Sequence, residues 1–464
     1  MKRNRRVAAS LAAAALLTTA ALPAATALGA APRSDTAAPA HGQSTTAPYG
    51  AVVATQNPVP ALNRAAYPLL STDPTGPLRD LRPLVRMVGN AQVVGVGEAT
   101  HSSSEFFTLK HRLFRALAEQ RGFTAFSLEA SWSTGVALDR YVVHGVGDPR
   151  AIMQHEFQGS YQFWNAEEYL DLIEWMRDYN RTHARKLHFV GNDLGYVSPA
   201  LLDLVTASAG KVRPALVPEL TRLYAGIRSG ANAADWTAQY VAKPLAERLK
   251  TEAATRQALA RVESLPASPG RTWTVQHART IWQVAKFFAM DIEDPAVLPS
   301  AMRFRDQVMA ENTAWWARTT GARTLLSAHN GHIALETSMP EQYPKIQGQF
   351  LREQLGKDYV AVGLSFDHGS FNALDVNDPN GAMRRFTLGP AAAGNNEHTL
   401  DRVAYRDYFV DLRTLPRSTK AWLQVKRPTR DIGTAYPWPD SKVALSASYD
   451  VLIHLAEVSA AHLR

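Results

Sequence analysis

Five ionisable side chains in this sequence have the chemistry needed to activate a water molecule. They are two glutamates and three histidines: Glu98, His101, Glu129, His329 and His332. Histidine accepts a proton near neutral pH, and a neighbouring carboxylate fixes which ring nitrogen carries the hydrogen. Other donors stabilise the oxyanion that forms when water attacks an ester carbonyl. These residue types together predict a site in which a histidine activates water.

Short apolar runs, typical of strands buried on both faces, precede these side chains. The strands are expected at residues 91–98, 123–129, 187–193, 324–327 and 359–366, with helices at 102–120, 165–180 and 449–461. Four of the five strands end in ionisable groups. The five residues above follow the first, second and fourth strands, and Asp193 ends the third. Ligand sites in parallel sheets form beyond the carboxyl ends of the strands, so we expect these groups to converge.

The order of strands and helices predicts an α/β fold with a mostly parallel sheet flanked by helices. A largely helical insertion or subdomain is expected at about 199–320, where we find no strand pattern. Burying several charges together is costly unless they have partners or a purpose. The convergence therefore favours a functional site over a set of unrelated capping residues.

Arg112 lies eleven residues after His101, close to three helical turns along the same expected helix. This spacing would direct it back along the same helix face toward the strand end. The alternative is an ordinary exposed arginine.

Two common enzyme classes do not fit the motifs. Gly95-Val96-Gly97-Glu98 opens like a dinucleotide-binding loop, but the third glycine is missing and Glu98 would face the pyrophosphate. Gly363-Leu364-Ser365-Phe366-Asp367 lacks the closing glycine of a serine-hydrolase elbow. The chain has no cysteine, which excludes a thiol nucleophile and thiolate metal sites. Water is therefore the expected nucleophile.

The first 30 residues have the pattern of a secretory signal peptide: a basic start, an apolar run and small residues. Arg5 and Arg6 leave Sec and twin-arginine export both open. Residues 31–60, rich in Ala, Pro, Ser and Thr, are expected to form a flexible lead-in to a hydrolase domain at 61–464. We expect a secreted, soluble protein, since no later run is apolar enough to span a bilayer.

Removal of residues 1–30 takes away Lys2, Arg3, Arg5 and Arg6, which lowers the formal charge from +8 to +4. No dense basic run interleaved with aromatic residues remains, so a nucleic-acid partner is not expected. The expected partner is a small-molecule ester.

Several motifs resemble those of the erythromycin esterase family. Gly97-Glu98-Ala99-Thr100-His101, followed by Glu105, His111 and Arg112, resembles its opening motif. Glu129 matches its second acidic position, Arg305-Asp306 with Met309, Ala310, Asn312 and Trp315 resembles a helical signature, and Ala328-His329-Asn330-Gly331-His332 resembles its paired histidines. The resemblance covers roughly residues 95–366.

This resemblance implies a carboxylic ester hydrolase, with macrolide lactones among the candidate substrates and no required metal or other cofactor. It assigns His101 as the base, Glu98 and Glu129 as orienting groups, and Arg112, His329 and His332 to the scissile group. It also implies a large cleft between the α/β core and the helical part, with Trp273, Trp282, Trp315 and Trp316 as candidate apolar walls. Export is a departure from an intracellular antibiotic-resistance enzyme.

Two other functions remain open on the sequence. The same glutamates and histidines are acceptable ligands for zinc, manganese or iron, so a metal-dependent hydrolase is an alternative. A non-catalytic protein that binds haem or a bulky lipophilic ligand is another, with the histidines as axial ligands. Chelation and haem titration would separate these alternatives.

Overall fold

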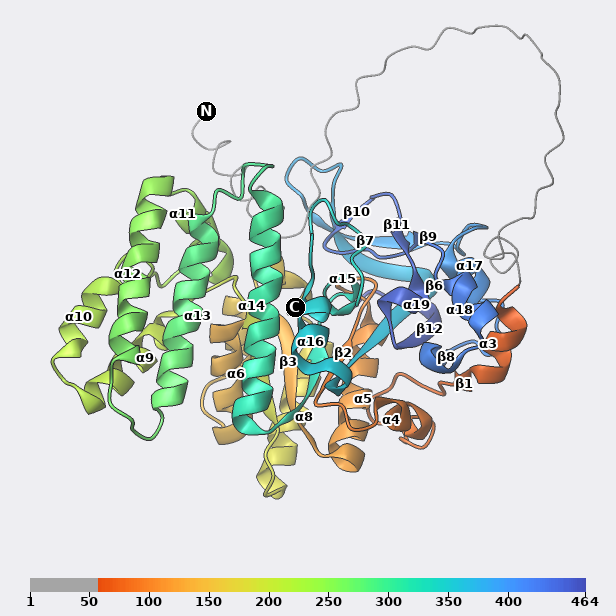
Figure 1. The fold of residues 1–464 in the computed structure, drawn as a ribbon, viewed down its shortest axis with the longest axis horizontal. Coiled ribbons are helices and arrows are strands. Elements are labelled where there is room, and N and C mark those ends of the chain that lie inside the picture. Colours follow the sequence, from red (N-terminus) through yellow and green to blue (C-terminus); the bar gives the residue numbers. More distant parts are fainter. Residues whose placement is uncertain (1–56) are drawn as a thin grey trace, which may run out of the picture.

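The computed structural model describes residues 57–464, which form a ten-stranded mixed sheet surrounded by helices (Figure 1). Its centre consists of six parallel strands. In spatial order these are β12 (Val451–Val458), β6 (Tyr359–Asp375), β2 (Val93–Val96), β5 (Arg323–Ser327), β3 (Phe123–Ser131) and β4 (His188–Asp193). The α/β fold with a mostly parallel sheet is therefore confirmed.

Short strands extend the sheet beyond β12 and beside the long strand β6. β8 (Tyr408–Asp411) is antiparallel to β12, and β1 (Tyr67–Pro68) is antiparallel to β8. β7 (Met383–Leu388) and β10 (Ala435–Tyr436) pair with the distal half of β6. A separate ribbon is formed by β9 (Arg427–Thr429) and β11 (Ser441–Val443).

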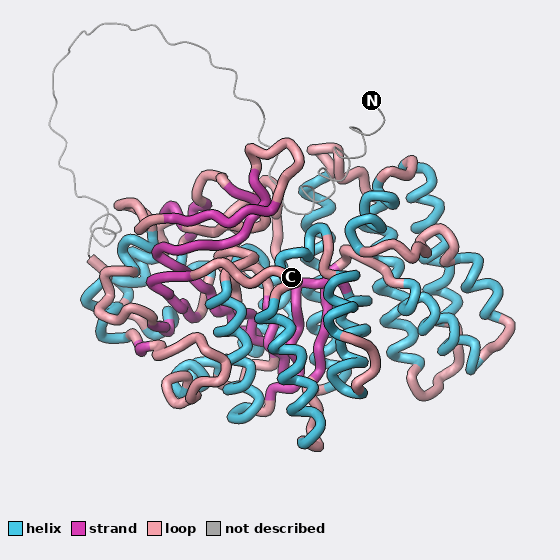
Figure 2. Tube along the Cα trace, turned by 180° about the vertical axis from the view of Figure 1, so that it is seen from behind, coloured by secondary structure: helices cyan, strands magenta, loops and turns pink. Residues whose placement is uncertain are grey.

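Helices connect the parallel strands and cover both faces of the sheet (Figure 2). Those before β4 are α3 (Val59–Ala65), α4 (Arg82–Val88), α5 (Ser104–Arg121), α6 (Trp132–His144), α7 (Pro149–Glu156) and α8 (Glu167–Thr182), with the 3-10 helix η1 (Gly159–Trp164). Those after β5 are α15 (Asn330–Ile333), α16 (Gln347–Leu355), α17 (Asn396–Leu400), α18 (Arg417–Leu423) and α19 (Leu445–Ser448), with η2 (Gly356–Asp358) and η3 (Leu412–Thr414).

The stretch between β4 and β5 is helical, as expected for 199–320. It comprises α9 (Pro199–Val212), α10 (Leu216–Leu223), α11 (Ala233–Val241), α12 (Leu245–Glu263), α13 (Arg271–Ala289) and α14 (Leu298–Thr320). Figure 1 shows α9 to α13 gathered at one end of the molecule, with α14 between them and the sheet.

Alternate residues of the central strands enter two different apolar cores. Val93, Ala125 and Val190 belong to the core on one face, whereas Val94, Phe126 and Phe189 belong to the core on the other. Both faces are therefore buried, which is why these strands are continuous apolar runs without alternating polar residues.

Helix α6 lies directly on the edge strand β4 because two glycines face each other. A Cβ atom on Gly135 would collide with the backbone of Gly191, and one on Gly191 would collide with the backbone of Ser131. This close approach fixes the start of α6 beside the carboxyl ends of β3 and β4.

The prediction of a helix at 449–461 is wrong, because the chain forms strand β12 there, between β6 and β8. Almost every residue of this strand is buried, so apolar residues on both of its faces imitate a helical apolar pattern. The other expected strands occur near their expected positions.

The expected signal peptide (1–30) and residues 31–56 of the expected lead-in lie outside the described residues; α3 begins at Val59. Across residues 57–464, none of the helices combines the length and apolar character needed to cross a membrane.

Candidate active site

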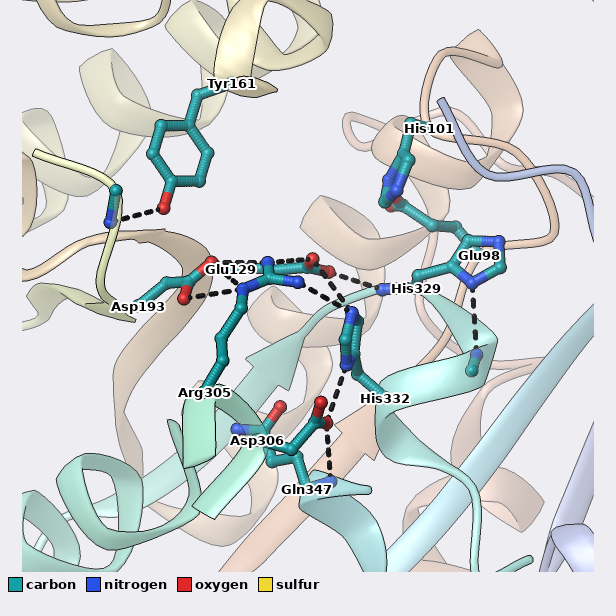
Figure 3. Close-up of polar contacts among 12 residues, drawn as sticks. Glu98, His101, Glu129, Tyr161, Asp193, Arg305, Asp306, His329, His332 and Gln347 are labelled. Carbon is teal, nitrogen blue, oxygen red and sulfur yellow. Dashed lines mark hydrogen bonds and ion pairs between the residues drawn. The ribbon is translucent and has the colours of Figure 1, made fainter. Parts of the chain in front are cut away.

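Side chains from four adjacent strands meet at the carboxyl edge of the sheet (Figure 3). Glu98 follows β2, Glu129 lies near the carboxyl end of β3, Asp193 ends β4 and His329 follows β5. Each of these side chains is more than nine-tenths buried. Buried charges require partners, so the partners of each group determine its charge and the direction of its hydrogen bonds.

Glu98 holds the imidazole of His101 in one tautomer. His101 Nδ1 donates to Glu98 Oε1 over 2.8 Å, while the ammonium of Lys110 binds the other oxygen, Oε2. Burial raises the pKa of Glu98, but attraction to Lys110 and His101 outweighs it, so the pKa is lowered and the carboxylate stays ionised. With the hydrogen on Nδ1, the Nε2 of His101 presents a lone pair and has no partner among residues 57–464.

Aromatic rings surround His101 on the side away from Glu98. The ring of Trp164 is 5.2 Å away edge-on, and that of Phe163 is 5.7 Å away. Both belong to η1, which precedes α8. The ring of His329 lies 4.9 Å from that of His101. His101 is therefore flanked by aromatic rings and is only 5% exposed, which limits its contact with bulk water.

Arg305 joins two carboxylates of different strands. Its Nη2 donates to Glu129 Oε1 over 2.9 Å and to Asp193 Oδ2 over 2.5 Å, and its Nε donates to Asp193 Oδ1 over 2.9 Å. Burial raises the pKa of Glu129, but attraction to His332, His101 and Arg305 outweighs this effect. The pKa is therefore lowered, and the carboxylate is ionised. Helix α14 thus supplies a buried cation to the strand ends.

His332 is held by carboxylates at both ring nitrogens. Nδ1 lies 2.7 Å from Asp306 Oδ1, and Nε2 lies 3.3 Å from both Glu129 Oε1 and Arg305 Nη1. Burial lowers the pKa of His332, but Asp306 and Glu129 raise it to about 9. His332 is therefore a cation at neutral pH, and Asp306 is itself fixed by the backbone N–H of Gln347.

His329 is neutral, and its ring hydrogen faces Asp431. Its Nδ1 accepts from the backbone N–H of Gly331 over 3.1 Å, so the hydrogen is on Nε2, 3.5 Å from Asp431 Oδ1. Burial lowers the pKa of His329 more than Asp431 raises it. Its backbone N–H donates to Glu129 Oε2.

Gly97 lets the short helix α15 lie against the end of β2. A Cβ atom on Gly97 would collide with the side chain of Asn330. The Asn330 amide bridges to β6, because it donates to the carbonyl of Leu364 and accepts from its N–H. This explains the glycine of the Gly97-Glu98 motif and the asparagine between the paired histidines.

The structure brings together five of the six residues singled out in the sequence: Glu98, His101, Glu129, His329 and His332. Arg112 is not among them, because its guanidinium binds Asp80 over 2.5 Å and the carbonyl oxygens of Ser71 and Pro77. The structure therefore places Arg112 apart from the cluster, with its guanidinium already bound by these groups. It is buried, and it ties α5 to the segment 71–80.

The sequence analysis assigned no role in the site to four of its charged residues: Lys110, Arg305, Asp306 and Asp431. For Lys110 a signal was present, because it lies three to four residues from Phe106, Phe107, Leu113 and Phe114 on the buried face of α5. Arg305 and Asp306 entered only through the family resemblance. Asp431 lies in the loop after β9, and no local pattern marks it.

The tryptophans expected to wall the cleft do not line the cluster. Trp273 and Trp316 line a separate cavity between α6, β4 and the helical part. Trp315 packs edge-on against Trp273 with ring centroids 5.0 Å apart, and Trp282 donates to Glu252.

A metal ion would need several convergent ligands. Within residues 57–464, no three His, Cys, Asp or Glu side chains are arranged so that they could hold one together. The glutamates and histidines of the cluster are instead paired with one another and with Lys110 and Arg305.

Residues 118–458 match the family model of the erythromycin esterases. This range includes Glu129, Arg305 and both histidines of the pair, and it begins after Glu98 and His101. A curated relative, an erythromycin esterase type II from Escherichia coli, is 23% identical over 366 residues, which are 74% of this chain and 85% of the relative.

Two solved structures share the fold. One, titled a succinoglycan biosynthesis protein, is 29% identical with a TM-score of 0.78, covering 88% of this chain and 98% of its own. The other, a mutant erythromycin esterase in its open conformation, is 19% identical with a TM-score of 0.64, covering 84% and 97%. Proteins of this fold therefore carry different names.

Proposed function

We propose, from the premise that this chain belongs to the erythromycin esterase family, that it hydrolyses a carboxylic ester with water activated by His101. The observation that carries this proposal is the unpartnered Nε2 of a histidine whose Nδ1 is held 2.8 Å from an ionised buried glutamate. This is the arrangement a general base requires.

In the proposed reaction, His101 Nε2 takes a proton from water as the water oxygen attacks the ester carbonyl. Glu98 stabilises the imidazolium, and the Nε2–H of His329, beside the His101 ring, donates to the developing oxyanion. Collapse of the tetrahedral intermediate breaks the carbonyl–alkoxide bond. The imidazolium returns its proton to the leaving oxygen, which yields an acid and an alcohol.

Arg305 and His332 have a positioning role in this proposal. Both are occupied by carboxylates, so they are poorly placed to bind substrate directly. They keep Glu129 ionised, and Glu129 fixes the backbone of His329. This differs from the direct contact with the scissile group that the resemblance implies for His332.

The proposed substrate class is a carboxylic ester, with a macrolide lactone as the specific candidate because a relative is named an erythromycin esterase. Export is also part of the proposal and rests on the pattern of residues 1–30. Amino-terminal sequencing of protein recovered from the culture medium would test it. Protein retained in the cell with Met1 in place would contradict it.

The decisive experiment incubates the purified protein with macrolides and with simple esters, in the presence and absence of EDTA. Mass spectrometry then measures the addition of water to each substrate. We expect a gain of one water that survives chelation, and a loss of at least about 10³-fold in His101→Asn. His155→Asn, at an exposed histidine, is the matched control. Loss of turnover on chelation would favour the metal alternative, and full turnover by His101→Asn would contradict the base.

A further inference from the structure

A cavity of about 340 Å³ lies along the face of α6 that packs on the edge strand β4. It is closed on its other side by α13 and α14 of the helical part. None of the cluster residues Glu98, His101, Glu129, His329 or His332 lines it. Its volume is within the range of small-molecule sites in proteins.

Three indole rings form most of the apolar wall. Trp132, Trp273 and Trp316 all line the cavity, and their rings meet edge to face, with centroids 5.2 Å apart for Trp273 and Trp316 and 6.3 Å apart for Trp132 and Trp316. Edge-to-face rings leave flat surfaces at right angles to one another. Such walls suit a planar aromatic ring better than a flexible aliphatic chain.

A histidine presents one donor into this apolar space. His277 is 8% exposed, and its Nδ1 accepts from the indole N–H of Trp132 over 3.0 Å. The hydrogen of the neutral ring is therefore on Nε2, and this nitrogen has no acceptor among residues 57–464. Burial lowers the pKa of His277 to about 4, so the ring remains neutral. A ligand with a hydrogen-bond acceptor would satisfy this donor.

The rim of the cavity carries an arginine that has no carboxylate partner within residues 57–464. Asp139 and His188 pair over 3.1 Å, and Asp139 also accepts from the N–H of Phe189. This arginine, Arg140, lines the same rim and is exposed. A ligand with an acidic group at its outer end would complement this charge.

From the indole walls and the Arg140 rim, we infer a second small-molecule site for a planar aromatic carboxylic acid. The aromatic ring lies among Trp132, Trp273 and Trp316, and its carboxylate faces Arg140. The site is separate from the ester-hydrolysing cluster, so its occupancy does not depend on the proposed reaction.

Binding of 2-naphthoate to the protein, measured by calorimetry and tryptophan fluorescence, tests this inference. We expect saturable binding at one site per chain with quenching of tryptophan emission. Val136→Phe, which fills the cavity, should abolish it, whereas Val146→Phe, an exposed valine in the loop after α6, should leave it unchanged. Thr320→Tyr narrows the exposed mouth and replaces Val136→Phe if that variant does not fold.

Two further variants test where the ligand binds and whether its negative charge contributes to binding. His101→Asn should bind 2-naphthoate as the unaltered protein does. Arg140→Gln should weaken 2-naphthoate about two- to fivefold, as expected for an exposed ion pair, and leave neutral 2-naphthamide unaffected. Absence of saturable binding, binding that survives Val136→Phe and Thr320→Tyr, or binding lost in His101→Asn would overturn the site. Equal effects of Arg140→Gln on both probes would overturn the assignment of an acid.

Discussion

Glu98 sets the tautomer of His101, the proposed base, and its removal should affect turnover more than substrate affinity. In Glu98→Gln an amide replaces the carboxylate, so the Nδ1–H form of His101 is no longer imposed and the imidazolium loses its counter-charge. We expect kcat to fall by about 10²- to 10⁴-fold with little change in KM. Steady-state kinetics measures this.

The matched control is Glu119→Gln, at an exposed glutamate near the end of α5. It should retain full turnover. A Glu98→Gln variant that keeps kcat within a factor of three would mean that Glu98 serves only to neutralise Lys110.

His332 should make stability depend on pH in the alkaline range. Its pKa is raised from 6.5 to about 9 in the folded protein, so the folded state binds the proton more tightly than the unfolded state does. The resulting stabilisation, on the order of a few kcal/mol, is complete below about pH 6.5 and is lost as the pH rises through about 9.

Urea unfolding of the protein and of His332→Gln between pH 6 and pH 10 isolates this contribution. The difference in the free energy of unfolding should shrink across that range. A constant difference would show that His332 is not protonated in the folded state.

Lys110 and Arg112 show what the sequence can predict at the residue scale. Both are buried residues of α5, but only Lys110 lies at helical spacing from the phenylalanines of the buried stripe, next to the ends of β2 and β5. The partners of Arg112 lie in the segment 71–80, which has no strand or helix pattern. Spacing along a helix identifies a face, and the contacts of an irregular segment have no such regularity.

At the scale of elements, α14 supplies charge to the site as well as cover. Arg305 neutralises Glu129 and Asp193, which belong to neighbouring strands. In Arg305→Gln two buried carboxylates lose their cation, so we expect a loss of about 3–5 kcal/mol in the free energy of unfolding. Chemical denaturation measures it.

Arg303→Gln, two residues earlier and exposed, is the control and should cost no more than about 1 kcal/mol, the value of its cation–π contact with Phe350. Equal unfolding midpoints for the two variants would show that the Glu129–Arg305–Asp193 bridge does not stabilise the fold.

The convergence of strand ends was predictable because it depends only on chain direction and alternation of strands with helices. It placed Glu98, Glu129, Asp193 and His329 at one edge without any knowledge of strand order. Apolar periodicity gave the wrong element for β12. Both faces of this strand are buried, which removes the period of two that identifies a strand.

At the scale of the whole molecule, residues 459–464 cross the starts of α5 and α8, which flank the base. Ser459 donates to Glu105 from both its N–H and its hydroxyl, and the N–H of Ala461 donates to the carbonyl of Ser102, next to His101. The N–H of Arg464 donates to the carbonyl of Asn165, next to Trp164. This segment therefore anchors the backbone next to both His101 and Trp164.

Deletion of residues 459–464 should lower kcat at least about tenfold, because small displacements of a catalytic group are costly and both sides of the His101 pocket lose a backbone anchor. The sheet itself should persist, since β12 ends at Val458 before the deletion. Kinetics and circular dichroism of the shortened protein measure the two effects. Arg464→Ala, which keeps the backbone contacts, is the control, and unaltered turnover by the shortened protein would show that the chain positions His101 without this segment.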